Sequence, residues 1–218
     1  MIELNEFEHK GWIKFECDKR VTRWANVANS KITTKLKNKK ILENNITCQG
    51  TWFVGVDALD NKPDGALDKI SLSGPFESLM RNSKTCGLHS AQVSIIFEGY
   101  PKPRDQESDS SFNFRLKRDA AHVDGLIADF PGGPRKLKEP HAYVLGIPLN
   151  QAPQGASPVV VWEGSHHLIS KAFKSLFLAR DPKEWKDLDV REIYMQTRKI
   201  IFEKCKRRVL HANLGESY

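Results

Sequence analysis

The chain has 218 residues, 39% of them hydrophobic, and a net charge of +7 from 34 Lys and Arg against 27 Asp and Glu. Five Trp and eleven Phe exclude a disordered chain and predict a folded protein, most simply a single domain over residues 1–218. No stretch approaches 18 consecutive apolar residues, and no nucleic-acid-binding motif accompanies the basic excess, which equally fits an anionic small substrate. We therefore expect no membrane and no nucleic acid among the partners.

The N-terminus and the cysteines indicate the compartment. Residues 1–12 lack the basic segment followed by an apolar run that marks a secretory signal peptide. Cys17, Cys48, Cys86 and Cys205 are widely spaced and include no C-x-x-C pair, so neither a zinc knuckle nor a redox motif is indicated. We expect free thiols and a cytoplasmic protein.

The first 45 residues are predicted to form a helical layer. Apolar residues recur at intervals of three and four, which gives a helix one apolar face, while Lys and Arg occupy the other faces. The apolar set is Val21, Trp24, Ala28, Ile32 and Leu36. We expect this helix to pack on the outside of a core rather than to enter a membrane.

From residue 46 the pattern becomes that of strands. Runs rich in β-branched and aromatic residues, or alternating in polarity, are separated by Gly, Pro, Asn and Asp. These runs predict strands at 47–59, 88–100, 112–116, 141–149 and 157–166, with a last strand opening after 206. A helical insert is predicted at about 167–204. Many short strands with helices outside them predict a mainly β protein with flanking helices, an antiparallel sandwich or barrel over residues 46–218.

The segment "KRDAAHVDGL" places a His and an Asp two positions apart, directly after the predicted strand at 112–116. Side chains at i and i+2 of an extended chain point the same way. His122 and Asp124 could therefore hold one metal ion from one side, or they could be two residues of a solvated strand face. Gly125 would keep the end of this segment open.

Three pieces in order strengthen the metal interpretation: "HVDG" at 122–125, "AYVLGIPL" at 142–149 and "VVVWEGSHH" at 159–167. Together they resemble the phytanoyl-CoA dioxygenase-like branch of the Fe(II)/2-oxoglutarate oxygenases, over roughly residues 88–218. Members of that branch are double-stranded β-helix proteins, a jelly-roll or cupin-like architecture. The resemblance implies an enzyme that uses Fe(II), 2-oxoglutarate and O2 to hydroxylate a small organic substrate.

The resemblance also implies roles for individual residues. His122 and Asp124 match the first two iron ligands of the family. Two imidazoles and one carboxylate on one face of Fe(II) leave three positions open for 2-oxoglutarate and O2. Tyr143 matches a strand that faces the cofactor in this family, which implies a hydrogen bond to 2-oxoglutarate.

The third ligand has two alternatives. In the family a distal His is followed about ten residues later by an Arg that pairs with the far carboxylate of 2-oxoglutarate. Either His211 is that His, or "ANLGES" is the turn before the penultimate strand and the distal His and Arg lie beyond Tyr218. No Arg follows His211 within these 218 residues under either alignment.

Other charged candidates have a structural interpretation. His166 and His167 follow the apolar strand and fit a structural turn. His89 and His141 each open a predicted strand and fit either surface residues or residues that contact the metal ligands without binding the metal. Arg115 and Arg118 fit a solvated strand edge, or contact with an anionic substrate.

The rival to the oxygenase hypothesis is a β-sandwich that binds a small molecule without catalysis, or an inactive relative with an incomplete iron site. The missing Arg favours this rival, whereas "HVDG" followed by "WEGSHH" counts against it.

Overall fold

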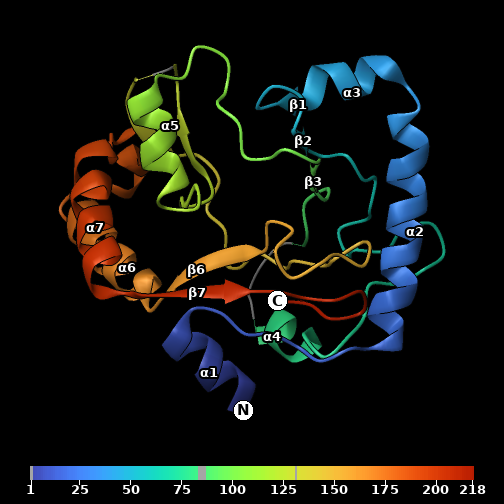
Figure 1. Cartoon of the computed structure of the whole chain (residues 1–218). Helices are drawn as coiled ribbons and strands as arrows, with labels where there is room; N and C mark the ends of the chain where they lie inside the picture. Colours follow the sequence, from blue (N-terminus) through green and yellow to red (C-terminus); the bar gives the residue numbers. More distant parts are fainter. Residues whose placement is uncertain (1, 83–86, 131) are drawn as a thin grey trace. The chain divides into compact units, whose positions relative to one another are not determined.

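A computed structural model of the chain describes residues 2–82, 87–130 and 132–218 (Figure 1). About 38% of it is helical and about 14% is strand. The strands form three small sheets with the orders β1-β2-β3, β4-β5 and β6-β7. The prediction of a mainly β, double-stranded β-helix or jelly roll is therefore wrong, because no sheet of the described chain has more than three strands and no barrel is formed.

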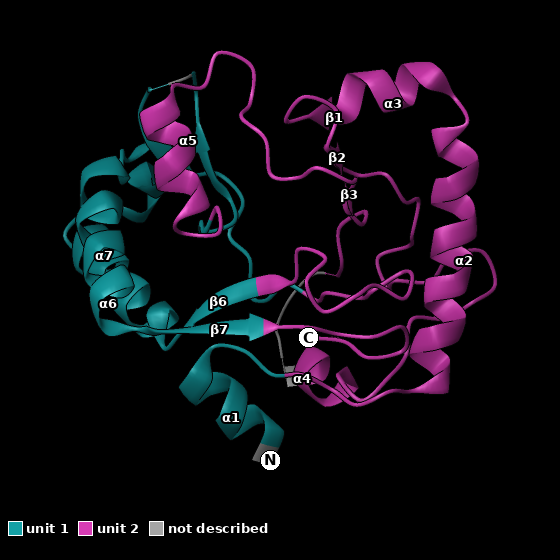
Figure 2. Ribbon diagram, viewed as in Figure 1, with its two compact units in different colours: residues 1–13, 121–144, 160–209 teal, residues 14–120, 145–159, 210–218 magenta. Residues whose placement is uncertain are grey.

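The chain forms two compact units that alternate along the sequence (Figure 2). Unit 1 contains residues 1–13, 121–144 and 160–209, and unit 2 contains residues 14–120, 145–159 and 210–218. Each unit has its own cluster of buried apolar side chains.

Unit 2 is built on helix α2 and a three-stranded antiparallel sheet. Its elements are α2 (Lys19–Leu36), α3 (Lys39–Asn45), β1 (Ile46–Thr47), β2 (Trp52–Gly55), α4 (Glu77–Asn82), β3 (Val93–Ile96) and α5 (Asp109–Leu116). The predicted apolar face of α2 is confirmed, since Trp24, Ala28 and Ile32 are buried in one cluster with Phe53 of β2 and Val93 of β3. The central strand β2 pairs with both neighbours and brings these side chains under the helix.

Unit 1 is built on two helices that follow one apolar strand. Its elements are α1 (Ile2–Lys10), β4 (Leu126–Ala128), β5 (Arg135–Leu137), most of β6 (Val159–Glu163), α6 (Ser165–Phe177), the 3-10 helix η1 (Pro182–Asp187), α7 (Arg191–Lys204) and most of β7 (Lys206–Leu210). Helices α6 and α7 lie where a helical insert was predicted at about 167–204, although the β-helix core that it was to interrupt is not formed. The core of unit 1 combines Phe173 and Phe177 of α6, Tyr194 of α7 and Leu126 of β4.

The predicted strand at 112–116 is wrong, because these residues belong to helix α5. The Ser108 hydroxyl accepts the Ser111 N–H, which caps the first turn of the helix. Near the other end, Arg115 forms two hydrogen bonds to Glu107. The sequence F-N-F-R-L alternates as a strand would, but it contains no β-branched residue to resist the helix.

The predicted strand at 141–149 is also absent, since this segment is irregular. Pro148 has no N–H to give to a ladder, and Gly146 lies against the Tyr218 ring. Gly146 exchanges both of its backbone hydrogen bonds with Tyr218, and the pairing extends no further along the segment. The segment "AYVLGIPL" thus lacks the strand that the resemblance assigned to it.

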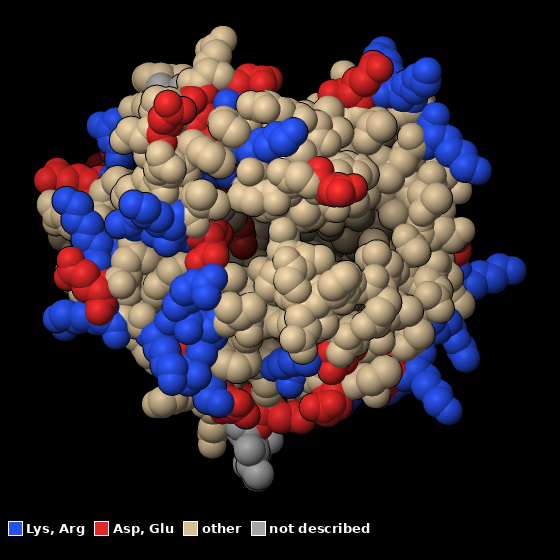
Figure 3. All heavy atoms as spheres, in the orientation of Figure 1, with Lys and Arg blue, Asp and Glu red and all other residues tan. Residues whose placement is uncertain are grey.

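Three further observations concern the surface charge, the length of the helices and the cysteines. On the face shown in Figure 3, Lys and Arg side chains are scattered among Asp and Glu side chains. Within the described ranges, no helix combines the length and the apolar character needed to cross a membrane. Cys17, Cys48 and Cys205 are free thiols, and Cys86 lies outside the described residues.

Candidate functional site

The His122 and Asp124 side chains meet on the surface of unit 1. The His122 Nε2 atom lies 3.1 Å from the Asp124 Oδ1 atom. The two side chains are 66% and 50% exposed, respectively. Both residues belong to the irregular segment that precedes β4, so this segment leads into a strand instead of following one.

The residue between them explains why they share a side. Val123 packs against the buried cluster of unit 1, which contains Leu126 and Tyr194. In an extended segment the neighbours of an inward-facing residue point outward. The alternation of exposed His122, half-buried Val123 and exposed Asp124 follows this rule. An imidazole and a carboxylate therefore face solvent together.

Gly125 fixes the end of this segment against the neighbouring chain. Its φ is +76°, and a Cβ atom there would collide with the carbonyl oxygen of Glu139. The Gly125 carbonyl oxygen accepts the N–H groups of Lys138 and Glu139 at 3.0 and 3.4 Å. Only glycine combines this backbone conformation with so close an approach. The "HVDG" segment is thus held beside the residues that follow β5.

That close approach brings a second His and carboxylate into the same region. The His141 Nε2 atom lies 3.9 Å from the Glu139 Oε2 atom, and both residues are exposed. The hydrogen bond from His122 lowers the pKa of the Asp124 carboxyl group, while its partial burial opposes this shift. Smaller contributions come from the charges of His122 and His141. At neutral pH Asp124 is a carboxylate, the form that can bind a cation.

The described residues contain no group of three or more His, Cys, Asp and Glu side chains arranged to hold a metal ion. The His122–Asp124 pair offers one nitrogen and one oxygen donor, which are two of the three donors of a facial triad. His211, one alternative for the third donor, belongs to unit 2, where its Nε2 atom lies 3.1 Å from the carbonyl oxygen of Ala152. Tyr143 is half-buried in the irregular segment of unit 1, so its contact with 2-oxoglutarate stays a prediction.

The remaining candidates make contacts of other kinds. The Nε2 atoms of His166 and His167 lie 2.8 and 3.2 Å from the carbonyl oxygens of Glu8 and His9, which joins the start of α6 to α1. Arg115 is paired with Glu107, as described above. The Arg118 guanidinium lies 4.0 Å from the centre of an aromatic ring, that of Phe114. His89 is exposed.

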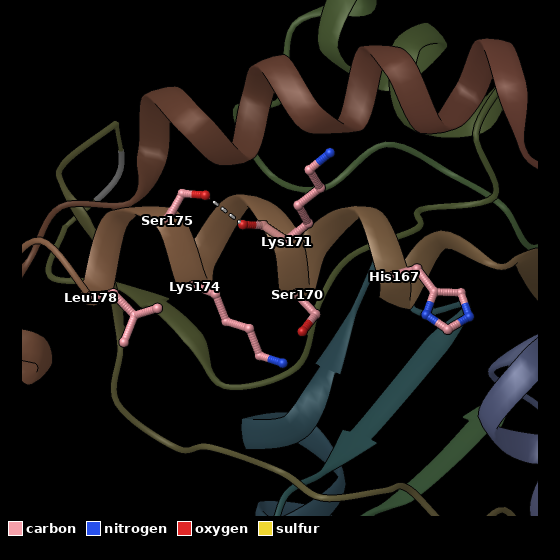
Figure 4. Close-up of a pocket in the computed structure, with 6 residues that line it drawn as sticks. All are labelled: His167, Ser170, Lys171, Lys174, Ser175 and Leu178. Atoms are coloured by element: carbon pink, nitrogen blue, oxygen red, sulfur yellow. Dashed lines mark hydrogen bonds between the residues drawn. The ribbon is translucent and has the colours of Figure 1, made fainter.

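A shallow depression of about 390 Å³ lies along α6 (Figure 4). Its lining consists of His167, Ser170, Lys171, Lys174, Ser175 and Leu178. All six residues come from one helix or its end, and the Ser175 hydroxyl donates to the backbone of Lys171 at 3.0 Å. The depression does not include the His122–Asp124 pair.

Comparisons of the chain with protein-family models, with curated proteins and with solved structures find no match. The resemblance drawn from the three sequence pieces accordingly stays a prediction. The candidate site is defined by the chain's own residues, and its centre is the His122–Asp124 pair.

Proposed function

We propose that this chain is part of an Fe(II)- and 2-oxoglutarate-dependent oxygenase, and that His122 and Asp124 bind the iron. The single observation that carries the proposal is the contact between these two exposed side chains. Since the predicted jelly roll is not formed, the proposal rests on these residues and on the sequence resemblance, not on the fold.

The donor chemistry of the pair fits two positions of such a site. A neutral imidazole and an ionised carboxylate are the donor types found in the 2-His-1-carboxylate sites of non-haem iron oxygenases. The Asp124 carboxyl group is ionised at neutral pH, and the exposure of both side chains leaves room for further ligands. When bound, iron with 2-oxoglutarate would supply the activation of O2 for hydroxylation.

The rest of the proposal follows from the sequence. A small organic substrate and O2 are the expected partners, the cytoplasm is the expected compartment, and Tyr143 is a candidate hydrogen-bond partner for 2-oxoglutarate. The third iron ligand is either His211 or a His beyond Tyr218. The alternative of a β-sandwich is also wrong as a fold, because the described sheets are too small to form one.

The test is anaerobic titration of the natural chain, including any residues beyond Tyr218, with Fe(II) and then with 2-oxoglutarate. We expect a weak visible metal-to-ligand absorption band after the second addition. The variants His122→Ala and Asp124→Ala should each lower iron affinity at least about a hundredfold, since each removes a direct ligand.

Two exposed residues of unit 1 serve as matched controls. The variants His9→Ala and Asp187→Ala remove the same side-chain types elsewhere on that unit and should leave both iron affinity and the band unchanged. Full iron affinity in His122→Ala or Asp124→Ala would remove that residue from the site. Absence of the band in the natural chain would overturn the oxygenase proposal.

A further inference from the structure

We propose that Tyr194 and Arg198 of helix α7 are positioning residues for the His122–Asp124 pair. Each makes a hydrogen bond to the main chain on one side of His122. This inference rests on the proposed function, because it assigns to α7 the task of aiming a metal-binding imidazole. All of these residues belong to unit 1.

Tyr194 holds the peptide group that follows His122. The N–H of Val123 donates to the Tyr194 hydroxyl oxygen over 3.2 Å. The Tyr194 side chain is part of the buried cluster of unit 1, and the residue is only 2% exposed. The hydroxyl is therefore presented from a rigid ring and satisfies a backbone donor beside the core.

Arg198 holds the peptide group that precedes His122. The Nη2 atom of Arg198 donates to the Ala121 carbonyl oxygen over 2.7 Å, a short bond as expected for a charged donor. The guanidinium lies over two rings of the same helix, 5.2 Å from the centre of the Tyr194 ring and 5.3 Å from that of Phe202. Residues at i, i+4 and i+8 share one face of a helix, so the two rings fix the guanidinium along that face.

The two bonds together restrain the backbone at a single residue. The peptide groups on either side of the His122 Cα atom are planar, so their orientation is set by the φ and ψ angles of His122 alone. A bond to the oxygen of the first group and a bond to the N–H of the second restrict both angles. They thereby set the direction in which the imidazole leaves the main chain, while Gly125 restrains the segment beyond Asp124.

This arrangement predicts loss of metal affinity from residues that touch no metal. Removing an outer partner of a metal ligand typically costs about ten- to a hundredfold in affinity. The variant Arg198→Met keeps an unbranched apolar stem but removes the guanidinium and every donor. Tyr194→Phe keeps the ring in the core but removes the acceptor. Arg198→Lys keeps a charged donor group but not the planar guanidinium and is the partial rescue.

The experiment uses Co(II) alone as the probe, since its visible spectrum reports the number and geometry of its ligands. Arg198→Met and Tyr194→Phe are each expected to weaken Co(II) binding about tenfold and to change the band intensities. Arg198→Lys keeps the charge and a donor but loses the planar guanidinium that lies over the two rings, so its Co(II) affinity should fall between those of Arg198→Met and the parent chain. Arg180→Met, which alters an exposed Arg of the same unit, should match the parent in both affinity and spectrum.

A second measurement needs no metal. Amide hydrogen exchange of Val123 should accelerate in Tyr194→Phe, because that N–H loses its partner, and should be unchanged in Arg180→Met. Co(II) binding by the parent chain that His122→Ala does not weaken would overturn the proposed function itself. Co(II) binding that depends on His122 but is identical in affinity and spectrum in Arg198→Met and Tyr194→Phe would overturn the positioning role alone.

Discussion

Two pairs of oppositely charged residue types, one in each unit, differ in how far they are exposed to solvent. In unit 2, the Arg115 Nε and Nη2 atoms donate to both carboxylate oxygens of Glu107, at 3.0 and 2.7 Å. Arg115 also donates to the Lys102 carbonyl oxygen, and Glu107 also accepts the Arg104 N–H. These two side chains are only 11% and 9% exposed.

In the His122–Asp124 pair of unit 1, the Nε2 and Oδ1 atoms lie 3.1 Å apart and the two side chains are 66% and 50% exposed. A nearly buried, hydrogen-bonded pair stabilises the fold, whereas a pair exposed to solvent is accessible to a ligand. This difference is why we assign a structural role to the first pair and a metal to the second.

The largest expected effect comes from Gly125, which holds the segment that carries the His122–Asp124 pair. Gly125→Ala should lower the free energy of unfolding by at least about 3 kcal/mol, because a non-glycine residue at φ +76° is strained and its Cβ would meet the Glu139 carbonyl oxygen. Gly132→Ala is the matched control. Its φ is +77°, in the turn between β4 and β5, and no atom lies within 4 Å of its added Cβ.

Urea denaturation of both variants separates strain from collision. Gly132→Ala should cost only the strain, about 1–2 kcal/mol. Equal losses in the two variants would show that the contact with Glu139 does not hold the "HVDG" segment. A larger loss in Gly125→Ala should be accompanied by weaker metal binding, since the segment that carries the ligands would have moved.

The sequence predicted the local elements better than their assembly. The apolar spacing in α2, α6 and α7 and the β-branched runs in β2, β3 and β6 are local signals, and they predicted helices and strands at those places. The segment at 112–116 failed because its helix depends on a Ser108 cap and on Glu107, both outside the alternating residues. A jelly roll requires pairing between strands that are distant in sequence, and no local pattern specifies that pairing.

The candidate site shows the same limit. The contact between His122 and Asp124 follows from a spacing of two in an extended segment, so the sequence could indicate it. The helix α7 residues that hold this segment are 71 and 77 positions away from the groups they bind, and a Tyr and an Arg on a helix carry no signal of such contacts. The need for glycine at 125 became clear only from its position against Glu139.

A smaller effect on stability is expected from the Arg115–Glu107 pair. Glu107→Gln should cost about 2 kcal/mol at pH 7, because it leaves the nearly buried Arg115 without its charged partner. The hydrogen bonds from Arg115 lower the pKa of Glu107 from 4.5 to about 2, against the opposing effect of burial. A group with a lowered folded-state pKa contributes stability that is present above pH 4.5 and is lost as the pH falls toward 2.

The cost of Glu107→Gln should therefore shrink as the solution is acidified. The measurement is urea denaturation of the parent and the variant at several values between pH 7 and pH 2. The difference in free energy should be constant down to about pH 5 and should decline below it. A difference that does not change with pH would mean that the ionised form of Glu107 contributes nothing, and the contrast between the two pairs would lose its physical basis.

The smallest expected effect on stability is the sharpest test of the contrast. His122→Ala should lower the free energy of unfolding by less than about 0.5 kcal/mol, because a contact between side chains that are 66% and 50% exposed is screened by water. The same substitution removes a proposed iron ligand, so iron binding should be lost while the fold is retained. Urea denaturation and iron titration of one sample measure both quantities.

A stability loss above about 1.5 kcal/mol would place His122 with Arg115 as a structural residue, because exposed pairs do not contribute that much. Little change in stability combined with loss of iron would separate a side chain that holds the fold from one that the fold presents to a ligand.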